Sequence, residues 1–309
     1  MKILVTGGAG FIGSNVADRF IELGHEVVIV DNLSSGYRKN VNPKAKFYEI
    51  DIRSTELEKV FEKEKPDIVD HHAAQISVPV SVKEPLLDAE INVLGFINIL
   101  QNCVKYKVKK VIFISSGGAI YGEATEYPTT ENYIPQPLSP YAINKYVSEN
   151  YLYYYRHQFG LNYTVLRYAN VFGPRQVPHG EAGVVSIFIT NLRDGKRSFL
   201  YAFPEKPEGM IRDYVFVKDV VEANVLVLEK GNLEAFNIGT NKETTTSELY
   251  DEISRQMGKN IEPIKADARE GDLRRSCLNF EKAKRILGWQ PKFSLAEGIA
   301  ETINYFTAK

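Results

Sequence analysis

Tyr141 and Lys145 are four residues apart, a spacing that would allow the tyrosine to act as a general base. Residues four apart lie on one face of a helix, so a helix over 141–157 would place the lysine beside the phenol. A free tyrosine, with a pKa of about 10, is a poor base at neutral pH, and a neighbouring cation favours its phenolate form. The spacing alone does not settle this role, because the same stretch carries Tyr146, Tyr151, Tyr153, Tyr154 and Tyr155.

A serine pair, Ser115-Ser116, ends a continuous apolar run over 111–114. Similar runs occur at 3–5, 27–30 and 68–69, and the stretch 163–167 reads as a further strand after the helix over 141–157. Uninterrupted apolar runs are typical of parallel strands that are buried on both faces. Stretches with helical periodicity, such as 11–23 and 54–64, lie between them. We therefore expect an α/β fold with a doubly wound parallel sheet, a Rossmann domain, whose carboxyl edge carries Ser115 and Ser116.

A glycine-rich turn directly follows the first expected strand and opens the first expected helix. It contains Gly7, Gly8, Gly10 and Gly13, which satisfy both G-x-G-x-x-G and G-x-x-G-x-x-G. Glycines here allow a tight turn and a close approach of the backbone to a pyrophosphate at the positive end of the helix. Asp31 ends the second strand, where it can accept hydrogen bonds from an adenosine ribose and would repel a 2′-phosphate. The pattern predicts NAD rather than NADP.

Polar residues near Asp31 extend this candidate cofactor site. Asn32, Ser35 and Gly36 follow in the same loop. Asp51 follows a third strand-like run and has two interpretations, a contact to the adenine amino group or the N-cap of the next helix.

Beyond residue 170 the alternation of strands and helices gives way to loop and turn sequences. Later stretches at 213–217 and 236–239 read as strands, and those at 247–257, 280–287 and 295–306 read as helices. No Ser/Gly linker and no repeat separates the two halves. We therefore expect a Rossmann domain over 1–170 and a smaller α/β lobe over 171–309, with some strands of the lobe returning to the main sheet.

Composition excludes several classes of protein. The 309 residues include 38 basic and 39 acidic side chains, so no basic excess points to nucleic acid. Cys103 and Cys277 are too few for a disulfide framework, fit a reducing compartment and lack metal-ligand spacing. No apolar stretch approaches the ~20 residues of a membrane span, and the first apolar run is too short for a signal peptide. We expect a cytoplasmic protein without membrane, nucleic-acid or metal partners.

Ordered motifs along almost the whole chain resemble those of the extended short-chain dehydrogenase/reductases. They comprise 6–13, Asp31-Asn32, 71–75, Ser115-Ser116, Tyr121-Gly122, Tyr141-x-x-x-Lys145, 168–176, Arg212-Asp213-Tyr214, 269–272 and 287–289. The pattern is similar to that of the UDP-glucose 4-epimerases. The 4,6-dehydratases and UDP-xylose-forming decarboxylases of this family carry a carboxylate at the strand end, whereas 115–122 contains none.

The resemblance implies epimerisation at C4 of a UDP-hexose through a transient 4-keto sugar, with NAD retained between cycles. Tyr141 would remove the proton of the 4-hydroxyl while C4 passes hydride to the nicotinamide. Lys145 would hold the nicotinamide ribose and lower the tyrosine pKa. Relatives usually carry a serine or threonine at the position of Gly117, so we hypothesise that Ser116, or a water, supplies the missing hydroxyl.

The resemblance also assigns binding residues. Those for the cofactor are Gly7, Gly10, Phe11, Ile12, Asp31, Asn32, Ser35, Gly36, Asp51, Ile52, His72, Ala73, Ala74, Ser115, Tyr141, Lys145 and Tyr168. Those for the substrate are Asn170, Val185, Tyr201 against uracil, Arg212 and Arg269 on the diphosphate, Asp272 on the uridine ribose, and Ser276. The small side chain of Ser276 suggests room for a 2-acetamido group.

The segments 88–106 and 141–157 resemble the helix pair that forms an intersubunit four-helix bundle in these enzymes, which implies a homodimer. Three alternatives to a UDP-hexose epimerase remain at this point. They are an epimerase that prefers UDP-N-acetylhexosamine or another sugar, a dehydrogenase with net oxidation, and a non-catalytic dinucleotide-sensing protein. The presence of both Tyr141 and Lys145 favours an enzyme.

Overall fold

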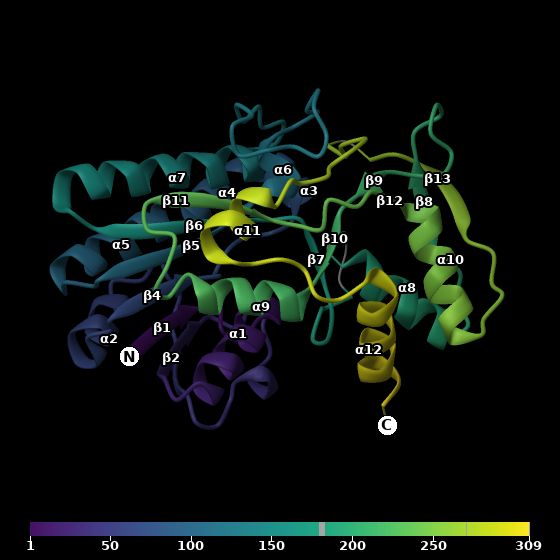
Figure 1. Ribbon diagram of the computed structural model, residues 1–309. Coiled ribbons are helices and arrows are strands. Elements are labelled where there is room, and N and C mark those ends of the chain that lie inside the picture. Colours follow the sequence, from purple (N-terminus) through teal and green to yellow (C-terminus); the bar gives the residue numbers. More distant parts are fainter. Residues whose placement is uncertain (179–182, 270, 309) are drawn as a thin grey trace.

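A seven-stranded parallel sheet with helices on both faces forms the larger part of the computed structural model, which describes residues 1–178, 183–269 and 271–308 (Figure 1). The strand order is β11-β6-β5-β4-β1-β2-β3, and every neighbouring pair is parallel. The strands are β1 (Lys2–Thr6), β2 (Glu26–Asp31), β3 (Lys46–Glu49), β4 (Ile68–His71), β5 (Lys110–Ser116), β6 (Asn162–Tyr168) and β11 (Glu234–Ile238). The chain winds outward from β1 in both directions, so the predicted doubly wound sheet is confirmed.

Successive side chains of each strand point to opposite faces, and each face packs on its own helices. Helices α1 (Phe11–Glu22) and α9 (Val217–Leu226) pack on the face that carries Ile3 and Val5. Helices α2 (Leu57–Glu64), α5 (Gly95–Lys105) and α7 (Pro140–Phe159) pack on the face that carries Leu4. Because both faces are covered, consecutive residues of the central strands are buried, as at Ile3, Leu4 and Val5 of β1, which agrees with the continuous apolar runs in the sequence.

The second lobe is built from short strands and helices beyond β6 (Figure 1). Its elements are β7 (Asn170–Phe172), α8 (Val184–Arg193), β8 (Phe199–Ala202), β9 (Ile211–Arg212), β10 (Tyr214–Phe216), β12 (Thr244–Thr245), α10 (Thr246–Met257), β13 (Ile264–Asp267) and α12 (Leu295–Thr307). The strands form three two-stranded sheets, β10-β7, β12-β9 and β13-β8. Between them the chain returns to the main sheet, where β11 pairs with β6 and α11 (Glu281–Leu287) packs on β11.

Helix α7 is the element that carries Tyr141 and Lys145. It begins after Ser139, whose side chain accepts a hydrogen bond from the Ala142 amide, and it ends at Gly160, which has a φ of 72°. The segment expected to be one helix over 88–106 is instead α4 (Pro85–Ala89), a π-helical turn η2 (Glu90–Leu94) and α5. The remaining short helices are η1 (Arg38–Asn40), α3 (Val78–Lys83) and α6 (Gly117–Ile120).

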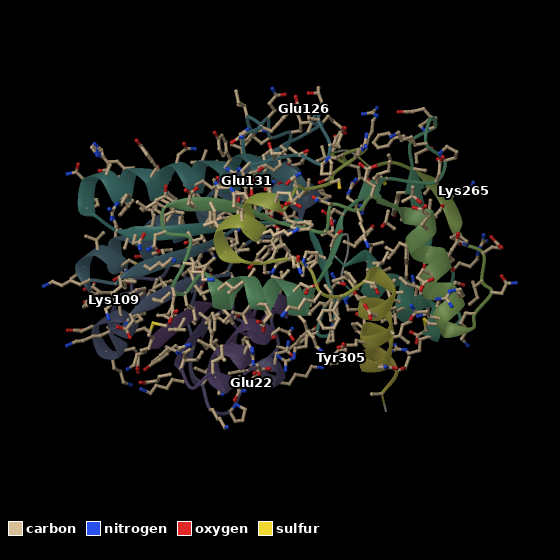
Figure 2. All side chains as sticks on the ribbon, in the orientation of Figure 1. Glu22, Lys109, Glu126, Glu131, Lys265 and Tyr305 are labelled. Carbon is tan, nitrogen blue, oxygen red and sulfur yellow. The ribbon has the colours of Figure 1, made fainter. Side chains whose placement is uncertain are left out.

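Charged side chains surround the molecule. Figure 2 shows Lys109 at the end of the main sheet and Lys265 at the far end of the second lobe. Within the described residues, no helix combines the length and apolar character needed to cross a membrane.

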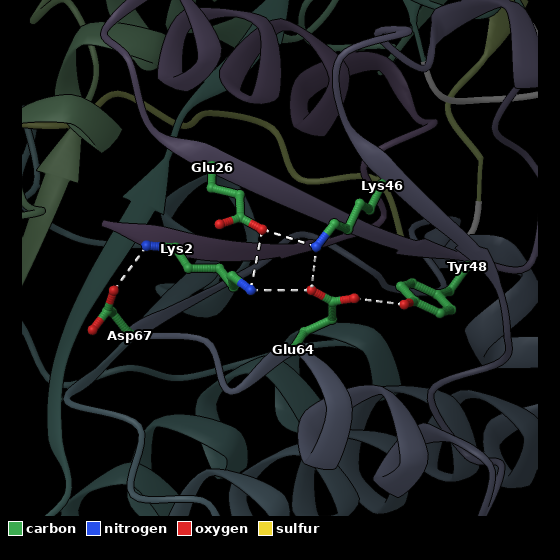
Figure 3. A network of polar contacts seen from close by, with 6 residues as sticks. All are labelled: Lys2, Glu26, Lys46, Tyr48, Glu64 and Asp67. Atoms are coloured by element: carbon green, nitrogen blue, oxygen red, sulfur yellow. Dashed lines mark hydrogen bonds and ion pairs between the residues drawn. The ribbon is translucent and has the colours of Figure 1, made fainter.

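A buried carboxylate, Glu64, joins three elements at the amino edge of the sheet (Figure 3). Its side chain accepts hydrogen bonds from Lys2 Nζ at 3.2 Å, Lys46 Nζ at 2.9 Å and Tyr48 Oη at 2.7 Å. Glu26 bridges the same two lysines. Burial acts to raise the pKa of Glu64, but the hydrogen bonds from Tyr48, Lys46 and Lys2 outweigh it and hold the pKa at about 2.

We predict that Glu64→Gln lowers the free energy of unfolding at pH 7 by about 2 kcal/mol, because it leaves two lysines beside a neutral amide. A carboxylate whose pKa is depressed on folding stabilises the folded state above its unfolded pKa. The difference between wild type and variant should therefore shrink as the pH falls from about 4.5 to about 2. Urea unfolding across this range measures it, and a difference that stays constant with pH would contradict the assignment.

Candidate active site

A cavity of about 950 Å³ lies at the carboxyl edge of the main sheet and extends to the second lobe. It is lined by most of the residues predicted from the sequence. These are Gly7, Gly10, Phe11, Ile12, Asp31, Asn32, Ser35, Asp51, Ile52, His72, Ala73, Ala74, Ser115, Ser116, Tyr141, Lys145, Tyr168, Asn170, Val185, Tyr201, Arg212, Arg269 and Asp272. Gly36 and Ser276 are the two predicted residues that do not line it. The fold therefore brings the Tyr-Lys pair, the glycine turn and the two arginines to one space.

The glycine turn leaves only backbone at the start of α1. Gly7 has a φ of 67°, and a Cβ there would lie 2.6 Å from the Ala73 amide nitrogen. A Cβ on Gly13 would lie 2.4 Å from the Gly7 carbonyl oxygen. No side chain caps α1 at Gly10, so its first amides are available to an anion. These features fit the pyrophosphate of a dinucleotide.

Asp31 stands beside this turn at the end of β2. Its carboxylate accepts hydrogen bonds from the backbone amides of Ala9 at 2.9 Å and Leu33 at 2.8 Å, which fix its orientation at the cavity. Gly36 packs against this turn, where a Cβ would meet the Ala9 carbonyl carbon at 2.8 Å. The close approach of the two backbones therefore explains why residue 36 is a glycine.

Asp51 is held at the cavity by side chains rather than by the helix that follows. It accepts hydrogen bonds from Asn32 Nδ2 at 2.9 Å and from the Arg53 guanidinium at 2.8 and 2.9 Å, and the Arg53 hydrogen bonds hold the pKa of Asp51 well below its ordinary value. The N-cap residue of α2 is Glu56, so the capping interpretation of Asp51 is wrong. The sequence analysis missed Arg53, for which no motif gives a signal.

Tyr141 and Lys145 lie on the buried face of α7 beside the end of β5. Lys145 Nζ donates a hydrogen bond to the Ile114 carbonyl at 2.9 Å and lies 6.0 Å from the centre of the Tyr141 ring. Burial raises the pKa of Tyr141 to about 12, against a hydrogen bond with Ser116 that lowers it. Burial lowers the pKa of Lys145 to about 8, against the charges of Asp88 and Glu149. Desolvation is therefore the dominant electrostatic effect on both groups.

The two glycines after Ser116 face different surroundings. A Cβ on Gly117 would meet Leu278 Cδ1 at 2.5 Å and the Arg167 carbonyl at 3.1 Å, away from the cavity. Gly118 lines the cavity, and a Cβ there would lie 3.4 Å from Asn170 Oδ1. Position 117 therefore faces the packed side chain of Leu278, whereas the Ser116 side chain hydrogen-bonds Tyr141.

The second lobe contributes a cluster of charged and aromatic residues. Arg269 pairs with Asp272, with Nε to Oδ2 at 3.2 Å, and its guanidinium carbon lies 4.5 Å from the centre of the Tyr201 ring. Burial lowers the pKa of Arg212, whose Nη1 donates to the Ile211 carbonyl at 2.9 Å. Ser276 is buried behind Gly118, with its Oγ 3.9 Å from a Cβ placed there. Glu270 of the 269–272 motif is outside the described residues.

Further residues line the cavity that the sequence analysis did not single out. They are apolar and come from the segment after β4, from the loop before α7 and from the second lobe: Ile76, Val78, Pro79, Val80, Leu138, Phe199 and Met210. An isolated apolar residue in a sequence gives no signal that separates a cavity wall from a core.

We predict that Gly117→Ser destabilises the protein by about 1–3 kcal/mol, because the new side chain must displace Leu278 in a packed region. Gly118→Ser is the matched control, since its Cβ makes only an ordinary contact with Asn170. Urea unfolding of the two variants tests this difference. Equal unfolding free energies would show that the backbone at the strand end is in another register.

Comparison with known proteins places these features in a family. A UDP-glucose 4-epimerase from Mycolicibacterium smegmatis is 44% identical over 316 aligned residues, covering 100% of this chain and 99% of that protein. The structure of a UDP-glucose 4-epimerase from Thermotoga maritima with UDP-glucose has a TM-score of 0.96 and 51% identity, covering 99% of this chain and 98% of that chain. A UDP-glucose 4-epimerase from Thermus thermophilus in complex with NAD has a TM-score of 0.95 and 44% identity, covering 100% of this chain and 99% of that chain.

The sequence pattern of the NAD dependent epimerase/dehydratase family matches residues 3–239. This range includes the glycine turn, Asp31 and the Tyr-Lys pair, and it ends just after β11. The resemblance to the UDP-glucose 4-epimerases and the NAD cofactor predicted from the motifs are thereby confirmed. The chain belongs to the NAD dependent epimerase/dehydratase family and is an NAD-dependent enzyme.

Proposed function

We propose that this enzyme interconverts UDP-glucose and UDP-galactose by epimerisation at C4. The observation that carries the proposal is that one cavity joins the Tyr141-Lys145 pair to Arg212 and Arg269 of the second lobe. The absence of a carboxylate from 115–122 argues against dehydration of the sugar. Similar structures contain NAD in one case and UDP-glucose in another.

The cofactor residues are those at the glycine turn and the adjoining strand ends. Backbone amides in the first turn of α1 would hold the pyrophosphate, and Asp31 would accept hydrogen bonds from the ribose hydroxyls. Bound NAD supplies a hydride acceptor and donor for C4. Asp31 keeps its orientation through the Ala9 and Leu33 amides, and its charge disfavours a 2′-phosphate.

Tyr141 acts as the base that takes the proton of the sugar 4-hydroxyl and later returns it. Ser116 is the last residue of β5 and its side chain hydrogen-bonds this phenol, so its hydroxyl relays hydrogen bonding between the sugar and Tyr141 Oη. Lys145 binds the nicotinamide ribose and stabilises the phenolate through its charge. Because burial holds the pKa of Tyr141 at about 12, this positive charge must act at short range to make the phenolate accessible.

The second lobe anchors the nucleotide while the sugar turns. Arg212 and Arg269 bind the diphosphate, and Asp272 binds the uridine ribose. Asp272 also holds Arg269 against Tyr201, which places an aromatic face where uracil stacks. Gly118 leaves the space beside Asn170 open, so the tethered 4-keto sugar has room to present its other face.

The enzyme acts in the cytoplasm as a homodimer. Both cysteines are buried and free, which fits a reducing compartment. An exposed apolar surface covers α4, η2 and α7, where Leu86 is 80% exposed, Leu94 58% and Tyr153 69%. These three elements pack together, so the exposed apolar side chains belong to neighbouring helical segments, and large exposed apolar surfaces are typical of protein interfaces.

The function is tested by incubating the purified protein with UDP-galactose, without added NAD, and following the sugar by NMR. We expect UDP-glucose to appear, because a retained cofactor is regenerated in each cycle. Tyr141→Phe should lower kcat by at least about 100-fold, while Tyr305→Phe, an exposed control, should not. Accumulation of NADH, or no conversion even with added NAD, would contradict the proposal.

The homodimer is tested by light scattering. Leu94→Asp places a charge in the exposed apolar surface and should convert a particle of twice the chain mass into a monomer. A monomeric wild type, or a variant with the mass of the wild type, would contradict this interface.

A further inference from the structure

A buried carboxylate behind the catalytic helix has no part in the chemistry described so far. Asp88 of α4 is fully buried. Its Oδ1 accepts hydrogen bonds from Gln75 Nε2 at 2.6 Å and Asn92 Nδ2 at 3.1 Å, and its Oδ2 accepts one from Asn144 Nδ2 at 2.7 Å. Gln75 belongs to the cavity-lining segment after β4, Asn92 to the π-helical turn, and Asn144 to α7 next to Lys145. One carboxylate thus joins three segments of the site.

Two of the amides are fixed with their NH2 groups toward Asp88. The Oε1 of Gln75 accepts a hydrogen bond from the Ser77 amide, and its Nε2 also donates to the Ser77 carbonyl. The Oδ1 of Asn92 accepts from the Gln75 amide, and its Nδ2 also donates to the Gln75 carbonyl. Three donors therefore converge on two acceptor oxygens, an arrangement that suits an ionised carboxylate and leaves no acceptor for a carboxyl proton.

The charge of Asp88 is not neutralised by an ion pair among the described residues. The other acid near Lys145, Glu149, pairs with Arg167 of β6 at 2.6 Å. On β4, burial and the charge of Lys145 hold the pKa of His71 well below its ordinary value, so that imidazole is neutral. Ser116 is the polar neighbour of Tyr141 from β5. Asp88 is therefore the unpaired anion that acts on Tyr141 and Lys145.

We propose that Asp88 is a positioning residue of the active site, whose ionised carboxylate fixes α7 against the cofactor-facing segment and keeps Lys145 an ammonium ion. The proposal rests on the roles of Tyr141 and Lys145 in the proposed function. A negative charge favours the protonated form of each group. Asp88 therefore keeps Lys145 charged to higher pH, and it also makes the Tyr141 proton harder to remove. The carboxylate sets the pH range in which the pair works.

The first test is the pH profile of kcat for Asp88→Asn with UDP-galactose. Loss of the charge lowers the pKa of both groups, so the rising and falling limbs should both move to lower pH, by roughly half a unit or more. A purely structural defect would lower the rate without moving the limbs. A variant with the wild-type limbs would overturn the electrostatic part of the proposal.

The second test exchanges the carboxylate and the amide. In Asp88→Asn the new NH2 group faces the NH2 group of Asn144, and the midpoint of thermal unfolding should fall. In the double variant Asp88→Asn/Asn144→Asp each hydrogen bond has a donor and an acceptor again, and one negative charge remains. We expect this variant to recover most of the unfolding midpoint and to move the pH limbs back toward wild type.

Glu64→Gln is the matched control, because it removes a buried carboxylate at the opposite edge of the sheet. It should lower the unfolding midpoint and leave the pH limbs unchanged. A double variant that is no more stable than Asp88→Asn would overturn the hydrogen-bond network. If Asp88→Asn does not fold, a folded double variant supports the network and an unfolded one overturns it. A wild type without epimerase activity would refute the proposed function, while the unfolding comparison would still test the network.

Discussion

Burying an ammonium group and a phenol side by side is the constraint on which this active site depends. Burial disfavours the charged form of each, so the pKa of Lys145 falls to about 8 and that of Tyr141 rises to about 12. Two features oppose this effect on Lys145: its hydrogen bond to the Ile114 carbonyl of β5, and the negative charges of Asp88 and Glu149, which raise its pKa. The position of α7 relative to β5 therefore controls the chemistry, and the surrounding structure holds that position.

The parallel sheet and the second lobe contribute different residues to the cavity. All strands of the sheet end at the same edge, so the glycine turn, Asp31 and the Ser115-Ser116 pair lie close together there as a direct result of the parallel topology. The second lobe closes the cavity from the other side with Arg212 and Arg269. The chain returns to the main sheet at β11, which pairs with β6 and so links the two parts.

Local sequence patterns predicted the fold and those site residues whose role follows from the backbone next to them. Gly7, Asp31, Tyr141 and Lys145 belong to this class, because turn geometry, strand ends and helical spacing determine where they lie. The strand-to-helix register at Gly117 and Gly118 was not predictable, since the two residues are chemically identical and only packing on Leu278 separates them.

Residues defined by long-range contacts escaped the sequence analysis. A cofactor contact by Gly36 stays a prediction, whereas its close packing on Ala9 depends on how two loops meet and has no local signal in the sequence. Asp88 belongs to no recognisable motif, and its amide partners come from three separate segments.

The most direct test of the mechanism is the fate of deuterium placed at C4 of UDP-galactose, followed during turnover with excess unlabelled NADH in solution. Retention of deuterium at C4 of the UDP-glucose formed is the predicted result, because hydride returns to the same carbon from a cofactor that stays bound. Loss of the label to the dissolved cofactor would contradict it.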